Sequence, residues 1–241
     1  MHCQQPSDKN LCSAGEIVKI VSFSGIDGAG KSTQIAALVA WLGQVGLSVR
    51  LLTFWDNVVV LSRVREFMSH AAFKGDQGIG SPEKPLHRRD KNVTAWPVSA
   101  MRYGLYFLDA INLCRTTRKV RKSGADVVIF DRYIYDELAN LPLNGGLAQA
   151  FIRLLLKLVP EPDIAYLIDA DPAAARARKP EYPLEFLRSN REAYLTLSRL
   201  TGAITVIDPL SVEAAGMRVK EAFLRTLPEA EEGFSGLPAL P

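Results

Sequence analysis

The sequence predicts an α/β protein with a parallel sheet, and three observations lead to this fold class. Five short apolar segments alternate with longer segments of helical periodicity, and strands that are separated by helices pair in parallel. A glycine-rich loop joins the first strand to the first helix. The 241 residues are 48% hydrophobic and 23% charged, which is enough for a large core. We expect a five-stranded parallel sheet with helices on both faces, in one domain over residues 17–227.

Each element is predicted from its own pattern. The first strand, at 17–24, is an apolar β-branched run that ends in glycine, and the next helix shows apolar residues at Ile35, Leu38 and Leu42, the spacing of one helical face. The later elements are expected as strand 47–54, helix 59–72, helix 98–122, strand 126–130, helix 147–158, strand 163–168, helices 172–179 and 184–200, strand 203–207 and helix 211–226.

Three segments fall outside this alternation. Residues 1–16 and 228–241 are expected to be flexible, because the first lacks a strand or helix pattern and the second is rich in Pro, Gly and Glu. Residues 74–97 form a connection that is long for a compact domain, and long ordered loops are usually functional. We therefore treat 74–97 as an inserted loop within the domain.

Composition excludes several functional classes. A formal charge of +3, from 29 basic and 26 acidic residues, does not indicate a nucleic-acid-binding protein. Three cysteines without CxxC or Cys/His spacing indicate neither a disulfide framework nor a zinc site. No apolar run resembles a signal peptide or a membrane span. We expect a cytoplasmic protein without membrane or nucleic-acid partners.

The loop between the first strand and helix reads GxxxxGKS and predicts a nucleotide-phosphate site of the P-loop NTPase fold. Glycines let backbone N–H groups converge on an anion, the helix N-terminus attracts it, Lys31 reaches the outer phosphates and the Ser32 hydroxyl can bind Mg²⁺. The loop predicts a nucleotide and Mg²⁺ as ligands, and the predicted binding residues are Gly25, Asp27, Gly28, Ala29, Gly30, Lys31, Ser32 and Thr33.

A phosphate-bridging Mg²⁺ also needs a carboxylate, commonly at the end of a buried strand. Asp131 ends one apolar strand, and Asp169 and Asp171 follow another. Asp171 precedes a proline, so it is favoured as a helix N-cap. We favour Asp131 as the metal ligand because Arg132 follows it directly, and a carboxylate and a guanidinium together can handle a metal and a phosphate.

Four segments together resemble the thymidylate kinase family of nucleoside monophosphate kinases. They are "GIDGAGKSTQ", "LYFLDAINL", "FDRY" and "PDIAYLIDADPAAARAR", in the family's order. The resemblance covers roughly residues 17–208 and implies a five-stranded P-loop fold. It also implies Mg²⁺-dependent transfer of the ATP γ-phosphoryl group to a nucleotide, with thymidylate as the default acceptor.

The resemblance implies roles for individual residues. Asp27 would face the acceptor's sugar, Phe107 would stack on its base, and Arg132 would hold its phosphate. Arg176 and Arg178 would lie in or beside a mobile lid at about 172–184 and neutralise charge during transfer, although both could instead belong to a solvated helix face. Family members often form dimers through helices, and the apolar segment "LAQAFIRLLLKLV" could serve a homodimer or be covered by its own sheet.

The acceptor side departs from the family pattern. Where the family places two arginines, this chain has Asp56 or Asn57 after the second strand, and Ile111 on the long helix. An apolar residue cannot replace a bidentate phosphate contact, so phosphate capture has moved or the acceptor carries less charge. Arg88 and Arg89 in the inserted loop are candidate replacements; the alternative is a solvated loop.

Aromatic side chains provide further acceptor candidates. Phe54, at the end of the second strand, is a candidate substrate contact. Tyr182 could stack on a base or pack under the turn between its flanking prolines. On the long helix, Tyr106 and Phe107 lie on different faces, so both cannot point into one pocket. Besides a nucleotide kinase, the sequence allows a kinase of nucleosides or other small molecules, and a nucleotide-binding regulatory protein with little transfer activity.

Overall fold

A computed structural model describes residues 18–60, 96–141, 143 and 145–227, with the backbone alone for 96–100. The predicted features at 1–16, 61–95 and 228–241, including Arg88 and Arg89 and most of the expected helix 59–72, lie outside these ranges. The elements are, in order, β1 (Lys19–Ser24), α1 (Lys31–Gln44), β2 (Val49–Thr53), α2 (Phe54–Asn57), α4 (Trp96–Val120), β3 (Val127–Asp131), α5 (Ile134–Leu138), α6 (Gly146–Leu158), β4 (Ile164–Ile168), α7 (Pro172–Arg178), α8 (Leu184–Thr201), β5 (Ile204–Ile207) and α9 (Val212–Leu224).

The five strands form one parallel sheet in the order β2-β3-β1-β4-β5. This confirms the predicted sheet. β1 lies in the centre, where Phe23 is in register with Asp131 of β3 and Ser24 with Leu167 of β4. Since the strands are parallel, their carboxyl ends meet at one edge, and the loops that follow β1, β3 and β4 are brought together there.

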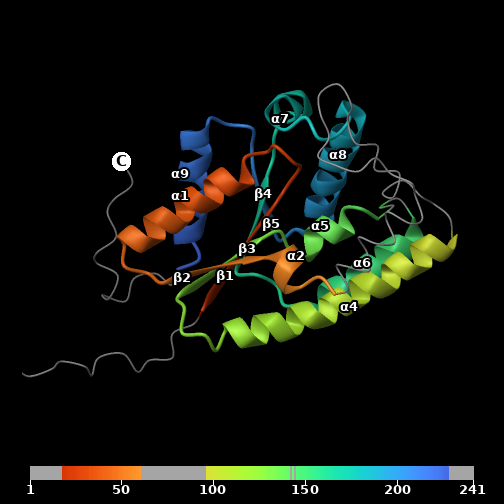
Figure 1. The fold of residues 1–241 in the computed structure, drawn as a ribbon, viewed down its shortest axis with the longest axis horizontal. Helices are drawn as coiled ribbons and strands as arrows, with labels where there is room; N and C mark the ends of the chain where they lie inside the picture. The colour runs from red at the N-terminus through yellow and green to blue at the C-terminus, as the bar shows by residue number, and fades with distance from the viewer. Residues whose placement is uncertain (1–17, 61–95, 142, 144, 228–241) are drawn as a thin grey trace, which may run out of the picture.

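The core divides into two clusters because successive side chains of a strand point to opposite faces. On β1, Val21 and Phe23 belong to the cluster under α1 and α9, while Ile20 belongs to the cluster under α4 and α6. On β3, Ile129 and Phe130 divide in the same way. Figure 1 shows α1 and α9 on one side of the sheet and α4 and α6 on the other. Helices therefore cover both faces, as the unbroken apolar strands predict.

Two short helices were not predicted. α2 follows β2 directly and begins at Phe54, which the sequence pattern placed in the strand. α5 follows β3 after only two residues, and its first turn is capped by Asp136, whose carboxylate accepts the Tyr133 N–H. Helices of four or five residues are too short to show a periodic pattern. Within the described residues, no helix is both long and apolar enough to cross a bilayer.

We predict that replacing Phe130 with Ala lowers the free energy of unfolding by about 3–5 kcal/mol, because the ring is fully buried and its loss leaves a cavity. Urea unfolding measures the change. Leu51 on β2 is the matched control, since it is 52% exposed and its replacement with Ala should change stability by about 0.5 kcal/mol or less. Equal losses in the two variants would contradict the assigned core.

Candidate functional site

The phosphate loop runs from Gly25 to Gly30 between β1 and α1, and two of its glycines touch neighbouring backbone. A Cβ on Gly25 would lie 2.5 Å from the carbonyl oxygen of Ile168, and one on Gly28 would lie 2.3 Å from that of Ala175. Both glycines also have positive φ angles, 142° and 82°, which side chains disfavour. The loop therefore packs directly on the end of β4 and on α7.

Lys31 lies at the base of this loop. It is the first residue of α1 and is 8% exposed, and its Nζ donates to the carbonyl oxygens of Gly25 and Ile26, both at 2.9 Å. Burial, and next the charge of Arg132, lower the pKa of Lys31 to about 8. Ser32, the next residue, is exposed. The ammonium, the helix N-terminus and this hydroxyl form one polar cluster that suits an anion.

Arg132 lies between two carboxylates beside the loop. Its Nη2 is 2.5 Å from Asp27 Oδ1, and its Nη1 is 3.0 Å from Asp136 Oδ1. Burial opposes the guanidinium charge, but Asp136 and then Tyr194 and Asp27 raise the pKa of Arg132 above its ordinary value. Burial likewise opposes the charge of Asp27, and Arg132 and Lys31 outweigh it, so the pKa of Asp27 is lowered. Arg132 and Asp27 therefore hold opposite charges at neutral pH.

The backbone of Arg132 is also unusual. It is the one non-glycine residue of the described chain with a positive φ angle, 70°, a conformation that costs an ordinary residue about 1–2 kcal/mol. Its N–H donates to the carbonyl of Phe23 at 2.9 Å, which ties the turn after β3 to β1. Such strain is commonly found at functional sites. The residue predicted to bind the acceptor phosphate is therefore held in an imposed conformation.

Sequence reasoning missed two members of this cluster, Asp136 and Tyr194. Both are buried, and the Tyr194 hydroxyl donates to Asp136 Oδ1 at 2.7 Å. Arg132 and Asp136 are only four residues apart, and this proximity in the chain was a usable signal, although Arg132 precedes α5 and lies outside the helix. Tyr194 lies 58 residues further along the chain, and no local pattern links it to the site.

The three candidate metal ligands have different surroundings. Asp171 caps α7 by accepting the Ala174 N–H at 2.8 Å, which confirms the N-cap prediction. Asp169 is engaged by Arg191 of α8 through two bonds of 2.6 Å. Asp131 is half-buried at the end of β3. No group of three or more His, Cys, Asp or Glu side chains in the described ranges could hold a metal by itself.

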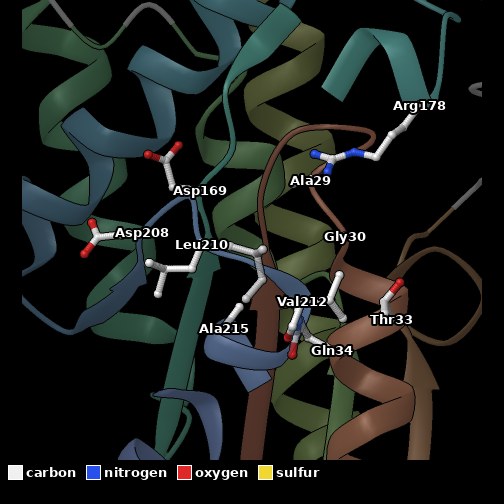
Figure 2. Close-up of a pocket in the computed structure, with 11 residues that line it drawn as sticks. Ala29, Gly30, Thr33, Gln34, Asp169, Arg178, Asp208, Leu210, Val212 and Ala215 are labelled. Carbon is white, nitrogen blue, oxygen red and sulfur yellow. The ribbon is translucent and has the colours of Figure 1, made fainter. Parts of the chain in front are cut away.

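A cavity adjoins the phosphate loop on the α9 side. Ala29, Gly30 and Thr33 line it, together with Arg178 of α7 and Leu210 after β5. Figure 2 shows the guanidinium of Arg178 directed toward Ala29. The structure thus brings this predicted lid residue to the loop. The lining also includes two carboxylates, Asp169 and Asp208. The cavity therefore combines one guanidinium, two carboxylates and apolar side chains.

Arg176, the other predicted lid cation, is half-buried on α7. Its Nε is buried and has no hydrogen-bond partner among the described residues. A buried donor of this kind carries a cost unless a partner satisfies it. One nitrogen of Arg176 is therefore withdrawn from solvent, while Arg178 is exposed, and the choice between a lid role and a solvated helix face stays a prediction.

The predicted aromatic acceptor contacts are not brought together in one place. Phe54 is 1% exposed in the core, so a direct substrate contact would require that core to open. Tyr182 is also buried and packs on Phe186 with ring centroids 5.1 Å apart. Phe107 is 39% exposed on α4, whereas Tyr106 on the neighbouring face is buried. Base stacking by Phe107 or Tyr182 stays a prediction.

The segment that replaces the first missing arginine has local partners. Asp56 Oδ2 accepts the Thr53 hydroxyl at 2.5 Å, and Asn57 Oδ1 accepts the Thr53 N–H at 3.0 Å. Ile111 is half-buried on α4. Neither position supplies a cation, so Arg132 is the acceptor-phosphate candidate that the described ranges retain.

Comparison with known proteins gives a consistent set of relatives. A probable thymidylate kinase from Pyrobaculum aerophilum is 31% identical over 183 residues, which cover 73% of this chain and 80% of the relative. A thymidylate kinase from Bifidobacterium longum subsp. infantis is 29% identical over 189 residues, covering 74% and 73%. The crystal structure of thymidylate kinase from Ehrlichia chaffeensis superposes with a TM-score of 0.56 at 18% identity, covering 86% of this chain and 98% of that one, and shows a shared fold. No protein-family model matches the chain.

We predict that replacing Gly28 with Ala weakens ATP binding at least about tenfold, because the new Cβ would displace α7 from the loop. Gly46 is the matched control: its φ of 83° resembles the 82° of Gly28, but its Cβ would meet nothing within 4 Å. Both variants should lose about 1–2 kcal/mol of stability from the left-handed backbone. Titration with a fluorescent ATP analogue and urea unfolding measure the two effects, and equal ATP affinity in the two variants would contradict the contact with α7.

Proposed function

The chain belongs to the thymidylate kinase family, and we propose that it transfers the γ-phosphoryl group of ATP, with Mg²⁺, to a nucleoside monophosphate. Thymidylate is the default acceptor, because the relatives are named as thymidylate kinases. The observation that carries the proposal is the convergence of Lys31, Arg132 and Arg178 on one glycine loop at the carboxyl edge of the sheet.

The loop fits the phosphates of a nucleoside triphosphate. Gly25 and Gly28 let the loop pack on neighbouring backbone without a side chain in between, and the N-terminus of α1 follows directly, so N–H groups of the loop and of the first helical turn could face an anion. Lys31 would exchange its bonds to the loop carbonyls for the outer phosphates. The nucleoside would occupy the cavity between the loop and the segment after β5.

The residues present also fit Mg²⁺. This ion prefers oxygen ligands and is usually held by one or two protein groups together with substrate phosphates and water. The exposed hydroxyl of Ser32 and the carboxylate of Asp131 are such groups. When bound, Mg²⁺ would neutralise charge on the β- and γ-phosphates.

The remaining chemistry is positioning and charge neutralisation. Arg132 would orient the acceptor phosphate, Asp27 would contact the acceptor's sugar, and Arg176 and Arg178 would stabilise negative charge on the transferred group. Contact of α7 with the loop would exclude water from the reacting atoms. The cytoplasmic location, the homodimer and the roles of Arg88 and Arg89 stay predictions.

One observation favours a second candidate, a kinase of nucleosides or similar uncharged acceptors. Arg132 is already paired with Asp27 and Asp136, and Asn57 and Ile111 replace the two expected arginines. A neutral hydroxyl acceptor needs fewer cations than a monophosphate.

Purified protein with ATP and Mg²⁺, given a panel of nucleosides and nucleoside monophosphates, separates these candidates. We expect acceptor-dependent ADP formation with thymidylate or another monophosphate. Replacing Lys31 with Met should lower the turnover at least about a hundredfold, because the mutation removes the positive charge that would stabilise the transferred phosphoryl group. Turnover with nucleosides alone would support the second candidate, and tight ATP binding without any transfer would indicate a regulatory protein.

The two carboxylates Asp131 and Asp171 allow a test of metal binding. We predict that replacing Asp131 with Asn raises the Mg²⁺ concentration needed for half-maximal activity about tenfold or more, because an amide is a weaker ligand than a carboxylate. Asp171→Asn is the control, since Asn is an equally good N-cap and the α7 cap persists. A greater effect in Asp171→Asn would mean that Asp131 is not the metal ligand.

A further inference from the structure

Asp136 lies behind Arg132, and the function proposed above gives it no role. Its carboxylate comes from α5 and is 3.0 Å from Arg132 Nη1, whereas Asp27 binds the other terminal nitrogen, Nη2. The residue is 7% exposed. A buried carboxylate needs partners for its lone pairs, so its other contacts decide what it can do.

The partners of Asp136 come from three separate segments: β1, the turn between β3 and α5, and α8. Oδ1 accepts from Arg132 and from the Tyr194 hydroxyl at 2.7 Å, while Oδ2 accepts from the Ser24 hydroxyl at 2.6 Å and the Tyr133 N–H at 3.1 Å. A carboxylate has about four acceptor sites, and four donors here engage them. Rotation of the carboxylate would break several of these bonds, so its position is fixed by β1, α5 and α8 together.

Exposure within this network is graded. The side chains of Arg132 and Asp27 are 24% and 17% exposed, whereas Asp136 is 7% exposed and Tyr194 is 4% exposed. A substrate can therefore meet Arg132 and Asp27 but not the groups behind them. Asp136 can act on a substrate only through Arg132.

The energetics also indicate positioning rather than stability alone. Buried ion pairs commonly stabilise a fold no better than well-packed apolar side chains, and Arg132 additionally has a strained left-handed backbone. Two carboxylates bound to different nitrogens of one guanidinium restrict both its position and its rotation. This combination restricts the direction in which the remaining guanidinium edge can bind an anion.

We propose that Asp136 is a positioning residue that, braced by Ser24 and Tyr194, fixes the guanidinium of Arg132 for the acceptor. The inference rests on the proposed kinase function for its consequence, but the positioning itself can be measured without catalysis. The test therefore uses two measurements, one of the motion of the guanidinium and one of catalysis.

The first measurement is guanidinium NMR of protein labelled with ¹⁵N-arginine, without substrate. A guanidinium that is paired with two carboxylates rotates slowly about its Cζ–Nη bonds. The NMR signals of Arg132 are identified as those that disappear in the Arg132→Lys variant. We expect Asp136→Asn to speed the rotation of the Nη1 group about tenfold or more, because a charge-assisted hydrogen bond is lost. Unchanged rotation in Asp136→Asn would overturn the proposal.

The second measurement is steady-state kinetics with the acceptor identified by the panel. Asp136→Asn should lower kcat/KM for the acceptor about tenfold and leave the KM for ATP within about twofold. In an Arg132→Lys background, the same change should have little further effect, because the residues act as one unit. The proposal would be overturned if the two substitutions lowered kcat/KM additively. It would also be overturned if Asp136→Asn impaired the use of ATP and of the acceptor equally. If no acceptor is phosphorylated, the proposed function fails, and the NMR still decides the role of Asp136.

A control and a milder variant complete the design. Asp126 precedes β3 and accepts the N–H and hydroxyl of Ser48, both at 2.6 Å, so Asp126→Asn removes a comparable carboxylate at the other end of the strand and should change neither readout. Tyr194→Phe removes one brace but retains the ion pair. Should Asp136→Asn not fold, Tyr194→Phe should still shift both readouts in the same direction by about threefold, and wild-type values there would overturn the proposal.

Discussion

The close contact of the phosphate loop with its neighbours is the constraint on which the rest of the site depends. Gly25 touches the end of β4 and Gly28 touches α7, at distances that leave no place for a Cβ. The loop conformation, the position of α7 and the approach of Arg178 to Ala29 are therefore determined together (Figure 2). Because packed backbone deforms little, the cations on α7 can serve the loop only while this contact holds.

The sequence predicted the sheet and the loop well because both depend on short-range patterns. Apolar runs located all five strands, and the GxxxxGKS spacing located the loop. Asp171 was also predicted as a cap from its neighbour alone. In each of these cases the deciding physics lies within a few residues: burial on both faces, glycine backbone freedom, or an N-cap before proline.

The rest of the site could not be predicted because it depends on long-range contacts. Asp136 gains its place from Ser24 and Tyr194, which are distant in sequence. Arg132 adopts a left-handed conformation. A glycine at this position would have suggested such a conformation from the sequence, but an arginine does not. Phe54 is a similar case. The sequence around an aromatic residue after a strand is the same whether the ring packs in the core, as it does here, or contacts a ligand.

The charges around Arg132 also bear on acceptor choice. An anionic acceptor would have to share the guanidinium with Asp27 or displace that carboxylate, and like charges close together repel. A site with this arrangement discriminates by geometry as much as by charge, because only an anion on the open edge of the guanidinium avoids the two carboxylates.

Helix α8 contacts both strand ends that flank the loop. Arg191 binds Asp169 after β4, and Tyr194, three residues further on, binds Asp136 after β3. Residues three apart lie on one face of a helix, so a single turn of α8 holds the segment after β4 and helix α5 at the same time. A tilt of α8 would therefore disturb both contacts together.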